Sequence, residues 1–256
     1  MLNLHYKEQG QGYPILLIHG LFGSLSNLGI LAKHLESLSY RVISIDTLNH
    51  GLSPRSQSMS YQHQAEAIKA LCDKLDITQC AIVGHSMGGK IGMAAAQLYP
   101  DLVNALVVAD IAPVAYQHNH TAVFSGLKSF DPKDIKSRSE AEKLLAKHIQ
   151  EPGVRQFLLK SLTNTEDGWQ WLFDVEQLAL CYKSIIGWEQ FGHYKRPCLF
   201  IKGENSDYIV SDYQQTVGQQ FPKAELKVIA GTGHWLHAEK PAIFNRLTEQ
   251  FLAKHI

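Results

Sequence analysis

The stretch Ala81-Ile82-Val83-Gly84-His85-Ser86-Met87-Gly88-Gly89 decides the fold that this chain is expected to adopt. An apolar run leads into the pattern Gly-x-Ser-x-Gly, and apolar residues at helical spacing follow from 90 to 98. A strand, a sharp turn and a helix in this order expose a serine hydroxyl above the edge of a sheet. The glycines leave room for the strained backbone of such a turn. We therefore expect Ser86 to be a nucleophile.

Short apolar runs of strand character recur on both sides of this turn. They lie at 14–18, 41–46, 80–84, 105–110, 197–203 and 225–229. Stretches with helical spacing alternate with them, at 27–38, 61–75, 87–98 and 241–253. This alternation predicts an α/β fold with a mostly parallel sheet that is flanked by helices.

The alternation stops after Pro113 and resumes at Pro197. We interpret residues 114–196 as an insertion placed before the last two strands. Its helical patterns lie at 139–149, 154–162 and 175–185, and they predict a helical cap. Residues 1–113 and 197–256 are expected to form the core of the fold.

The composition argues against several classes of protein. The 256 residues contain 24 Lys plus Arg and 24 Asp plus Glu, so no positive surplus favours a nucleic acid or an anionic membrane surface. The four cysteines form no Cys-x-x-Cys pair, which favours a reducing compartment. Neither a signal peptide nor an apolar run of roughly 18 residues is present. We expect no membrane span and a cytoplasmic location, and nothing indicates the oligomeric state.

A serine hydroxyl attacks well only when a histidine, oriented by a carboxylate, takes its proton. In chains with the elbow pattern, the acid and then the histidine follow the serine. His234 is our candidate base because it lies in the glycine-rich turn Ala230-Gly231-Thr232-Gly233-His234-Trp235. His237 is the main competitor, but the residues after it are typical of a helix entry.

Two carboxylates compete for the role of the acid. Asp110 directly ends one predicted strand, whereas Asp207 lies four residues into the loop after another. Glu204 is a weaker third candidate. From the residues alone, Asp110 and Asp207 are equal alternatives.

Two backbone N–H groups are needed to hold the oxyanion of a tetrahedral intermediate. The N–H of Met87, which follows the serine, is one candidate. The other is expected from His19-Gly20-Leu21-Phe22-Gly23, where we favour Leu21 and take Phe22 as the second choice. We interpret His19 as a core histidine that bonds to loop carbonyls.

The motifs of metal and dinucleotide sites are missing from the sequence. It contains no His-Glu-x-x-His, no cysteine cluster and no Gly-x-Gly-x-x-Gly after the first strand. We therefore expect neither a metal nor a cofactor.

Four motifs in order resemble those of the α/β-hydrolase superfamily. They are His19 to Gly23, Asp46 to Ser53, Gly84 to Gly89 and Gly231 to Trp235. The resemblance runs from Pro14 to Phe251. Further segments are similar to bacterial esterases within that superfamily: 20–24, 49–54, 110–114, 156–161 and 234–241.

The resemblance implies a fold, a set of site residues and an activity. It favours Asp110 over Asp207 as the acid of a Ser86, His234 and Asp110 triad, and it leaves a shared role for Asp207 open. Ser206 is expected to bond near His234.

The similar bacterial esterases are associated with acyl esters and acyl-CoA thioesters. Our hypothesis is thus a serine esterase or thioesterase that cleaves a small-molecule substrate through an acyl-enzyme on Ser86. Its activity should rise as the pH passes roughly 6 to 7, where an ordinary histidine loses its proton. The alternatives are carbon–carbon bond hydrolysis or perhydrolysis on the same fold, and a non-catalytic ligand-binding protein.

Overall fold

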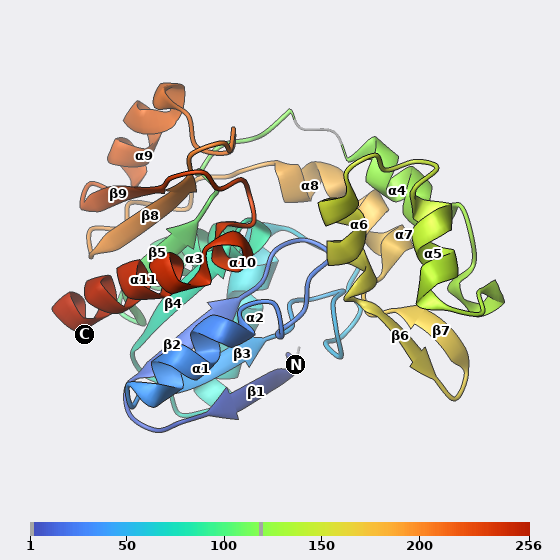
Figure 1. The fold of residues 1–256 in the computed structure, drawn as a ribbon. Coiled ribbons are helices and arrows are strands. Elements are labelled where there is room, and N and C mark those ends of the chain that lie inside the picture. Colours follow the sequence, from blue (N-terminus) through green and yellow to red (C-terminus); the bar gives the residue numbers. More distant parts are fainter. Residues whose placement is uncertain (1–2, 118–119) are drawn as a thin grey trace.

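The computed structural model describes residues 3–117 and 120–256. In this part of the chain, seven strands form a central sheet in the order β1-β3-β2-β4-β5-β8-β9 (Figure 1). The strands are β1 Tyr6–Gln9, β2 Pro14–Ile18, β3 Arg41–Ile45, β4 Cys80–His85, β5 Val103–Ala109, β8 Cys198–Gly203 and β9 Ala224–Ile229. β1 runs antiparallel to β3, and the other neighbouring pairs are parallel. The mostly parallel sheet is therefore confirmed.

The six strands predicted as apolar runs occur within two residues of the expected bounds. β1 was not predicted, because its residues Tyr6–Gln9 are mostly polar and at least partly exposed at the edge of the sheet. β4, by contrast, is buried at every position, because both of its faces are covered.

Two apolar layers lie on the two faces of the sheet. Ile15 and Leu17 of β2 belong to one cluster with the residues of helices α1 (Gly29–Ser37) and α11 (Pro241–His255). Leu16 and Ile18 point to the other face, because side chains alternate along a strand. On that face they pack with helices α2 (Tyr61–Lys74) and α3 (Met87–Leu98). Shorter elements complete the core: the 3-10 helix η2 Ser211–Tyr213, α9 Gln214–Gln220 and α10 Leu236–Glu239.

The residues between β5 and β8 form a group of helices and a hairpin beside the sheet (Figure 1). The elements are α4 Thr121–Lys128, η1 Pro132–Asp134, α5 Arg138–Leu145, α6 Pro152–Leu159, β6 Leu162–Thr165, β7 Gly168–Trp171, α7 Val175–Leu180 and α8 Tyr182–Ile186. Helices α5, α6, α7 and α8 overlap the ranges predicted as helical, and their bounds extend beyond those ranges by at most two residues. Helix α4 and the hairpin β6-β7 were not predicted. The division into a core and a cap at 114–196 stays a prediction.

Within residues 3–117 and 120–256, no helix has both the length and the apolar character that a membrane span needs.

Candidate active site

Ser86 lies at the sharp turn between β4 and α3. Its backbone angles, φ 53° and ψ −121°, are strained for a residue with a side chain. The Ser86 N–H donates to the carbonyl of Ala109 at 2.9 Å, which anchors the turn to β5. A Cβ atom at Gly84 would lie 2.2 Å from the Gly88 carbonyl oxygen, and one at Gly88 would lie 2.2 Å from that of Ile18. Both glycines are therefore required by close backbone contacts.

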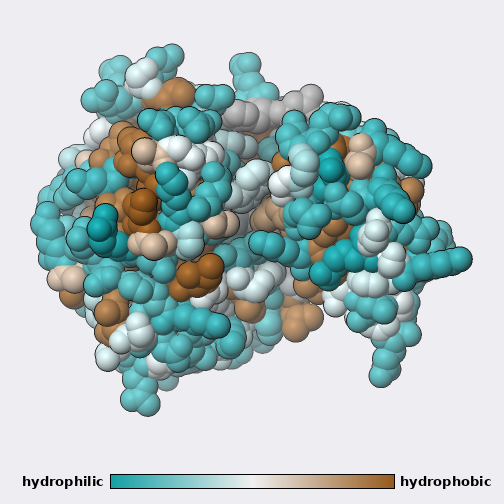
Figure 2. Space-filling model, in the orientation of Figure 1, coloured by the Kyte–Doolittle hydropathy of each residue, from teal (hydrophilic) through white to brown (hydrophobic). Residues whose placement is uncertain are grey.

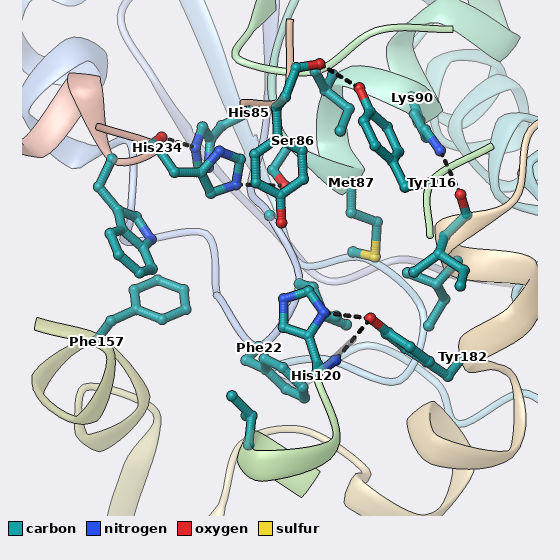
Figure 3. A pocket seen from close by; sticks show the side chains of 18 of the residues that line it. Phe22, His85, Ser86, Met87, Lys90, Tyr116, His120, Phe157, Tyr182 and His234 are labelled. Atoms are coloured by element: carbon teal, nitrogen blue, oxygen red, sulfur yellow. Dashed lines mark hydrogen bonds between the residues drawn. The ribbon is translucent and has the colours of Figure 1, made fainter. Parts of the chain in front are cut away.

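The structure brings Ser86, His234 and Asp110 together from three segments that are far apart in the sequence. Nε2 of His234 lies 2.9 Å from Oγ of Ser86, and Nδ1 lies 2.7 Å from Oδ2 of Asp110. Figure 3 shows the imidazole beside the serine at the cavity. With the proton on Nδ1 donated to the carboxylate, Nε2 is left to accept the proton of the hydroxyl.

Asp110 is fully buried where β5 ends. Its other oxygen, Oδ1, accepts the N–H of Gly203 at 2.9 Å. The hydroxyl of Ser206 donates to Oδ2, the oxygen that also faces His234. The sequence prediction that Ser206 bonds near His234 therefore corresponds to a bond with the carboxylate.

The other two carboxylates that the sequence left open lie elsewhere. Asp207 is exposed, and the carboxylate that contacts His234 is that of Asp110. Glu204 accepts the N–H of Gly231 at 2.7 Å, so it supports the turn that carries His234.

Further contacts fix the position of His234. The ring of Tyr208 stacks on its imidazole, with centroids 4.0 Å apart. Burial, together with nearby Tyr182 and Asp110, raises the pKa of Tyr208 to about 12, so its hydroxyl keeps its proton at neutral pH. Nε2 of His85 donates to the carbonyl of His234 at 2.8 Å.

His237, the competing histidine, is buried behind this group. Its ring lies 4.3 Å from that of His85, and no bond joins it to Ser86 within the described residues. Burial, reinforced by His234 and Lys160, lowers the pKa of His237 to about 3. The ring is therefore neutral over the pH range in which a histidine base works.

The candidate oxyanion donors belong to residues that surround the cavity beside Ser86. Leu21 and Met87 both line it, and neither N–H has a hydrogen-bond acceptor among the described residues. The N–H of Phe22, by contrast, donates to Nε2 of His50 at 3.1 Å. Between Leu21 and Phe22, Leu21 is thus the better candidate donor to the oxyanion.

His19 has the structural role that the sequence predicted. Its Nδ1 donates to the carbonyl of Gly20 at 2.7 Å, and its Nε2 accepts the N–H of Thr47 at 3.1 Å. Burial lowers the pKa of this ring. His19 therefore braces the segment that carries Leu21 without contacting Ser86.

Two contacts that hold Phe22 were missed by the sequence analysis. Besides the bond from its N–H to His50, its carbonyl accepts the hydroxyl of Ser161 at 2.9 Å. Ser161 lies between α6 and β6, so a residue of the insertion holds the loop beside Ser86. The only sequence signal for the contact between Phe22 and Ser161 was indirect: both residues lie in segments that are similar to bacterial esterases.

An apolar cavity of about 210 Å³ opens over Ser86. The inserted elements supply aliphatic and aromatic lining residues: Val123, Val154, Phe157, Leu158, Ile185 and Ile186. The core supplies Phe22, Met87 and Ile111 among others. Such a lining is suited to an apolar group of a ligand held beside Ser86.

Lys90, also missed, is a buried amine in the cavity wall, one turn after Ser86 on α3. Figure 3 shows its Nζ beside a backbone carbonyl; it donates to those of Ile186 at 3.0 Å and Gly187 at 2.6 Å. Burial lowers the pKa of Lys90 to about 7. These bonds join α3 to the end of α8.

The described part of the chain gathers no group of three or more His, Cys, Asp or Glu side chains that could hold a metal ion. Its four cysteines are free. The predictions of no metal and no cofactor stay predictions.

Comparisons with known proteins bear on the fold and the family of this chain. Residues 13–134 match the model of a family described as the alpha/beta hydrolase fold. Esterase YbfF of Escherichia coli is 41% identical over 96% of this chain and 95% of its own. The sn-1-specific diacylglycerol lipase ABHD11 of Danio rerio is 37% identical over 93% of this chain and 78% of its own.

Among solved structures, a marine microorganism esterase has a TM-score of 0.94 and 36% identity, over 98% of this chain and 100% of that one. The fold and the superfamily expected from the sequence are confirmed. The chain therefore belongs to the α/β-hydrolase family.

Proposed function

We propose that this protein hydrolyses carboxylic esters or thioesters through an acyl-enzyme on Ser86. The observation that carries the proposal is the hydrogen-bonded series of Ser86, His234 and Asp110 at the base of an apolar cavity. This arrangement has what nucleophilic attack on an acyl carbonyl requires.

The first half-reaction follows from these positions. His234 takes the proton of Ser86 through Nε2 as the serine oxygen attacks the acyl carbonyl. The N–H groups of Leu21 and Met87 stabilise the oxyanion that forms, since both residues line the cavity and neither N–H has an acceptor among the described residues. The imidazolium that results is stabilised by Asp110. It then protonates the leaving alcohol or thiol, which departs.

In the second half-reaction, water attacks the acyl-enzyme. His234 accepts a proton from this water and returns it to Ser86 as the acid is released. Asp110 keeps the imidazole in the same orientation throughout, because Gly203 and Ser206 fix its two oxygens.

The apolar lining supports an acyl group of hydrocarbon character. The names of the relatives, an esterase and a diacylglycerol lipase, support ester substrates. The thioester activity is proposed from the resemblance to bacterial esterases. We propose a small-molecule substrate and no nucleic acid, and a cytoplasmic location stays a prediction from the sequence.

The test is hydrolysis of a graded series of p-nitrophenyl esters and acyl-CoA thioesters. Their acyl chains range from about two to sixteen carbons, which covers the lengths that a ligand pocket accommodates. Wild-type protein and Ser86→Ala are compared, with circular dichroism to show that both are folded. We expect turnover by the wild type and a loss of about 10³-fold or more in the variant.

The outcomes separate the alternatives. Turnover of esters but not of thioesters limits the leaving group to alcohols. If the folded wild type cleaves none of these substrates, the ester hydrolase proposal is wrong. Carbon–carbon bond hydrolysis or perhydrolysis on the same fold would then be examined by product analysis, and ligand binding after that.

A further inference from the structure

The strand β9, Ala224–Ile229, is the last strand of the central sheet and pairs on one side, with β8, within the described chain. Leu226 and Val228 expose 54% and 52% of their surface, and both point to the same face of the sheet. Figure 2 shows hydrophobic atoms gathered at the side of the molecule where Figure 1 places β8 and β9. An uncovered edge of this kind is a template for another strand.

The backbone groups that face outward can be identified from one bond. The N–H of Glu204, directly after β8, donates to the carbonyl of Ile229 at 3.1 Å, so the backbone of Ile229 points toward β8. Because the direction of these groups alternates with each residue, the backbone groups of Leu226 and Val228 point outward. A strand that joins this edge would bond to these two residues.

We propose that β9 pairs with β9 of a second copy of this chain, antiparallel about a twofold axis at Leu226. In this register Glu225 lies opposite Lys227 of the second copy, on both sides of the axis. Opposite charges at such positions stabilise a sheet, whereas like charges destabilise it. The symmetric register about Lys227 would instead place two lysines opposite each other. Charge complementarity therefore selects the register about Leu226 and a copy of this chain as the occupant.

The backbone pattern fits the same register. Leu226 exchanges its N–H and carbonyl bonds with Leu226 of the second copy. Glu225 and Lys227 then form a pair without backbone bonds, the type in which side chains approach most closely. The N–H of Val228 donates to the carbonyl of Ala224, but the N–H of Ala224 is already bonded to Phe221 at 2.9 Å. The contact is short, so we infer a weak dimer whose population depends on concentration.

The charge pair has one competitor within the chain. Oε1 of Glu225 lies 3.4 Å from Nζ of Lys254, and both side chains are exposed. Exposed ion pairs of this length are weak in water. Glu225 is therefore available to Lys227 of the second copy.

The experiment measures mass by sedimentation equilibrium over concentrations of roughly 1 to 300 µM, a range suited to weak interfaces. We expect the mass of the wild type to rise from 28.7 kDa toward twice that value. Glu225→Lys puts lysines opposite each other, and Lys227→Glu puts glutamates opposite each other. Each variant alone should dissociate at least about tenfold more readily.

Mixing the two variants is the decisive step. In a mixed dimer every lysine again faces a glutamate, so equal amounts should dimerise with a dissociation constant within about threefold of that of the wild type. The double variant Glu225→Lys with Lys227→Glu should also dimerise. Glu166→Lys, at the exposed turn between β6 and β7, is the matched control and should behave as the wild type.

Two results would overturn the proposal. A wild-type mass of 28.7 kDa at the highest concentration means that a second copy does not occupy this edge. Failure of the mixture and of the double variant to recover dimers means that the register is wrong. Ester hydrolysis should be the same in all these variants, because none of the changed residues lines the cavity.

Discussion

The hydroxyl of Ser206 donates to Oδ2 of Asp110, the same carboxylate oxygen that accepts the Nδ1–H of His234. Asp110 is fully buried, and Gly203 N–H occupies its other oxygen. A buried carboxylate needs several donors to remain charged, because water cannot reach it. The end of β8 supplies one of them through Gly203, and the loop after it supplies another through Ser206, so this segment contributes to the position of the imidazole although Asp207 does not touch it.

This arrangement predicts that Asp110 and Asp207 differ sharply in importance. Asp110→Asn keeps the shape but replaces an acceptor of the Nδ1 proton with an amide that favours the wrong tautomer of His234. We expect kcat for a p-nitrophenyl ester to fall by about 10³- to 10⁴-fold. Asp207→Asn is the matched control, and its kcat should change by less than about twofold, because the side chain is exposed. Equal losses in both variants would contradict the assignment of Asp110.

Ser206 is predicted to act through Asp110 and not on the substrate. Ser206→Ala removes one bond to a buried carboxylate, which costs about 1.5 to 3 kcal/mol for a charged partner. We expect kcat to fall by about 10- to 100-fold while KM stays within about twofold. Steady-state kinetics give both values, and Ser211→Ala, at the start of η2, is the control. A rise in KM with an unchanged kcat would point to a role in substrate binding.

The inner strands β2, β3, β4, β5 and β8 could be predicted from the sequence because burial on both faces makes them apolar runs. The edge strand β1 could not, because its residues Tyr6–Gln9 have no such run. The hairpin β6-β7 was missed although Asp167-Gly168 is a turn signal, and Gly168 indeed has φ 97°. In the insertion, one predicted helix at 175–185 is two helices that meet at Cys181. Short helices of this kind depend on packing that a periodic pattern does not record.

The candidate site shows the same division between local and long-range information. The elbow at Ser86 is local, and its glycines and flanking runs identify it. The choice between Asp110 and Asp207 depends on which loop reaches His234, and strand ends alone left both open. The bond from Ser161 to Phe22 joins residues 139 positions apart, and no local pattern reports it.

The bond from Ser161 to the Phe22 carbonyl predicts that a residue of the segment between β5 and β8 affects the rate of ester cleavage. Ser161 holds the carbonyl of Phe22, next to the Leu21 N–H proposed for the oxyanion. Ser161→Ala frees this loop and leaves a buried carbonyl unpaired, at a cost of about 1 to 3 kcal/mol. We expect kcat/KM for a p-nitrophenyl ester to fall by about 5- to 100-fold.

The control for this variant is Ser129→Ala, whose hydroxyl bonds to the carbonyl of Gly126 within the insertion. It removes a similar bond without touching the loop of Leu21. If both variants lose activity equally, the effect of Ser161 comes from the stability of the insertion and not from the loop.

The low pKa of His237 predicts that the protein loses stability in acid. Burial, with His234 and Lys160, lowers its pKa to about 3, whereas an unfolded histidine has a pKa of about 6.5. Between these values the unfolded chain binds a proton that the folded chain does not. The free energy of unfolding therefore falls as the pH falls, by up to about 1.4 kcal/mol per pH unit from this residue. The loss begins below about pH 7 and is complete near pH 3.

Urea unfolding at several values from about pH 7.5 to 4.5 measures this slope in the wild type and in His237→Gln. Over the acid part of that range, the wild type should lose about 1 kcal/mol per pH unit more than the variant. The variant keeps a pH dependence of its unfolding free energy to which His19, His50 and His85 contribute. Burial lowers the pKa of each of these rings as well. His193→Gln, at an exposed site, is the control and should keep the wild-type slope. Parallel curves for the wild type and His237→Gln would show that the ring is not held neutral in the folded protein.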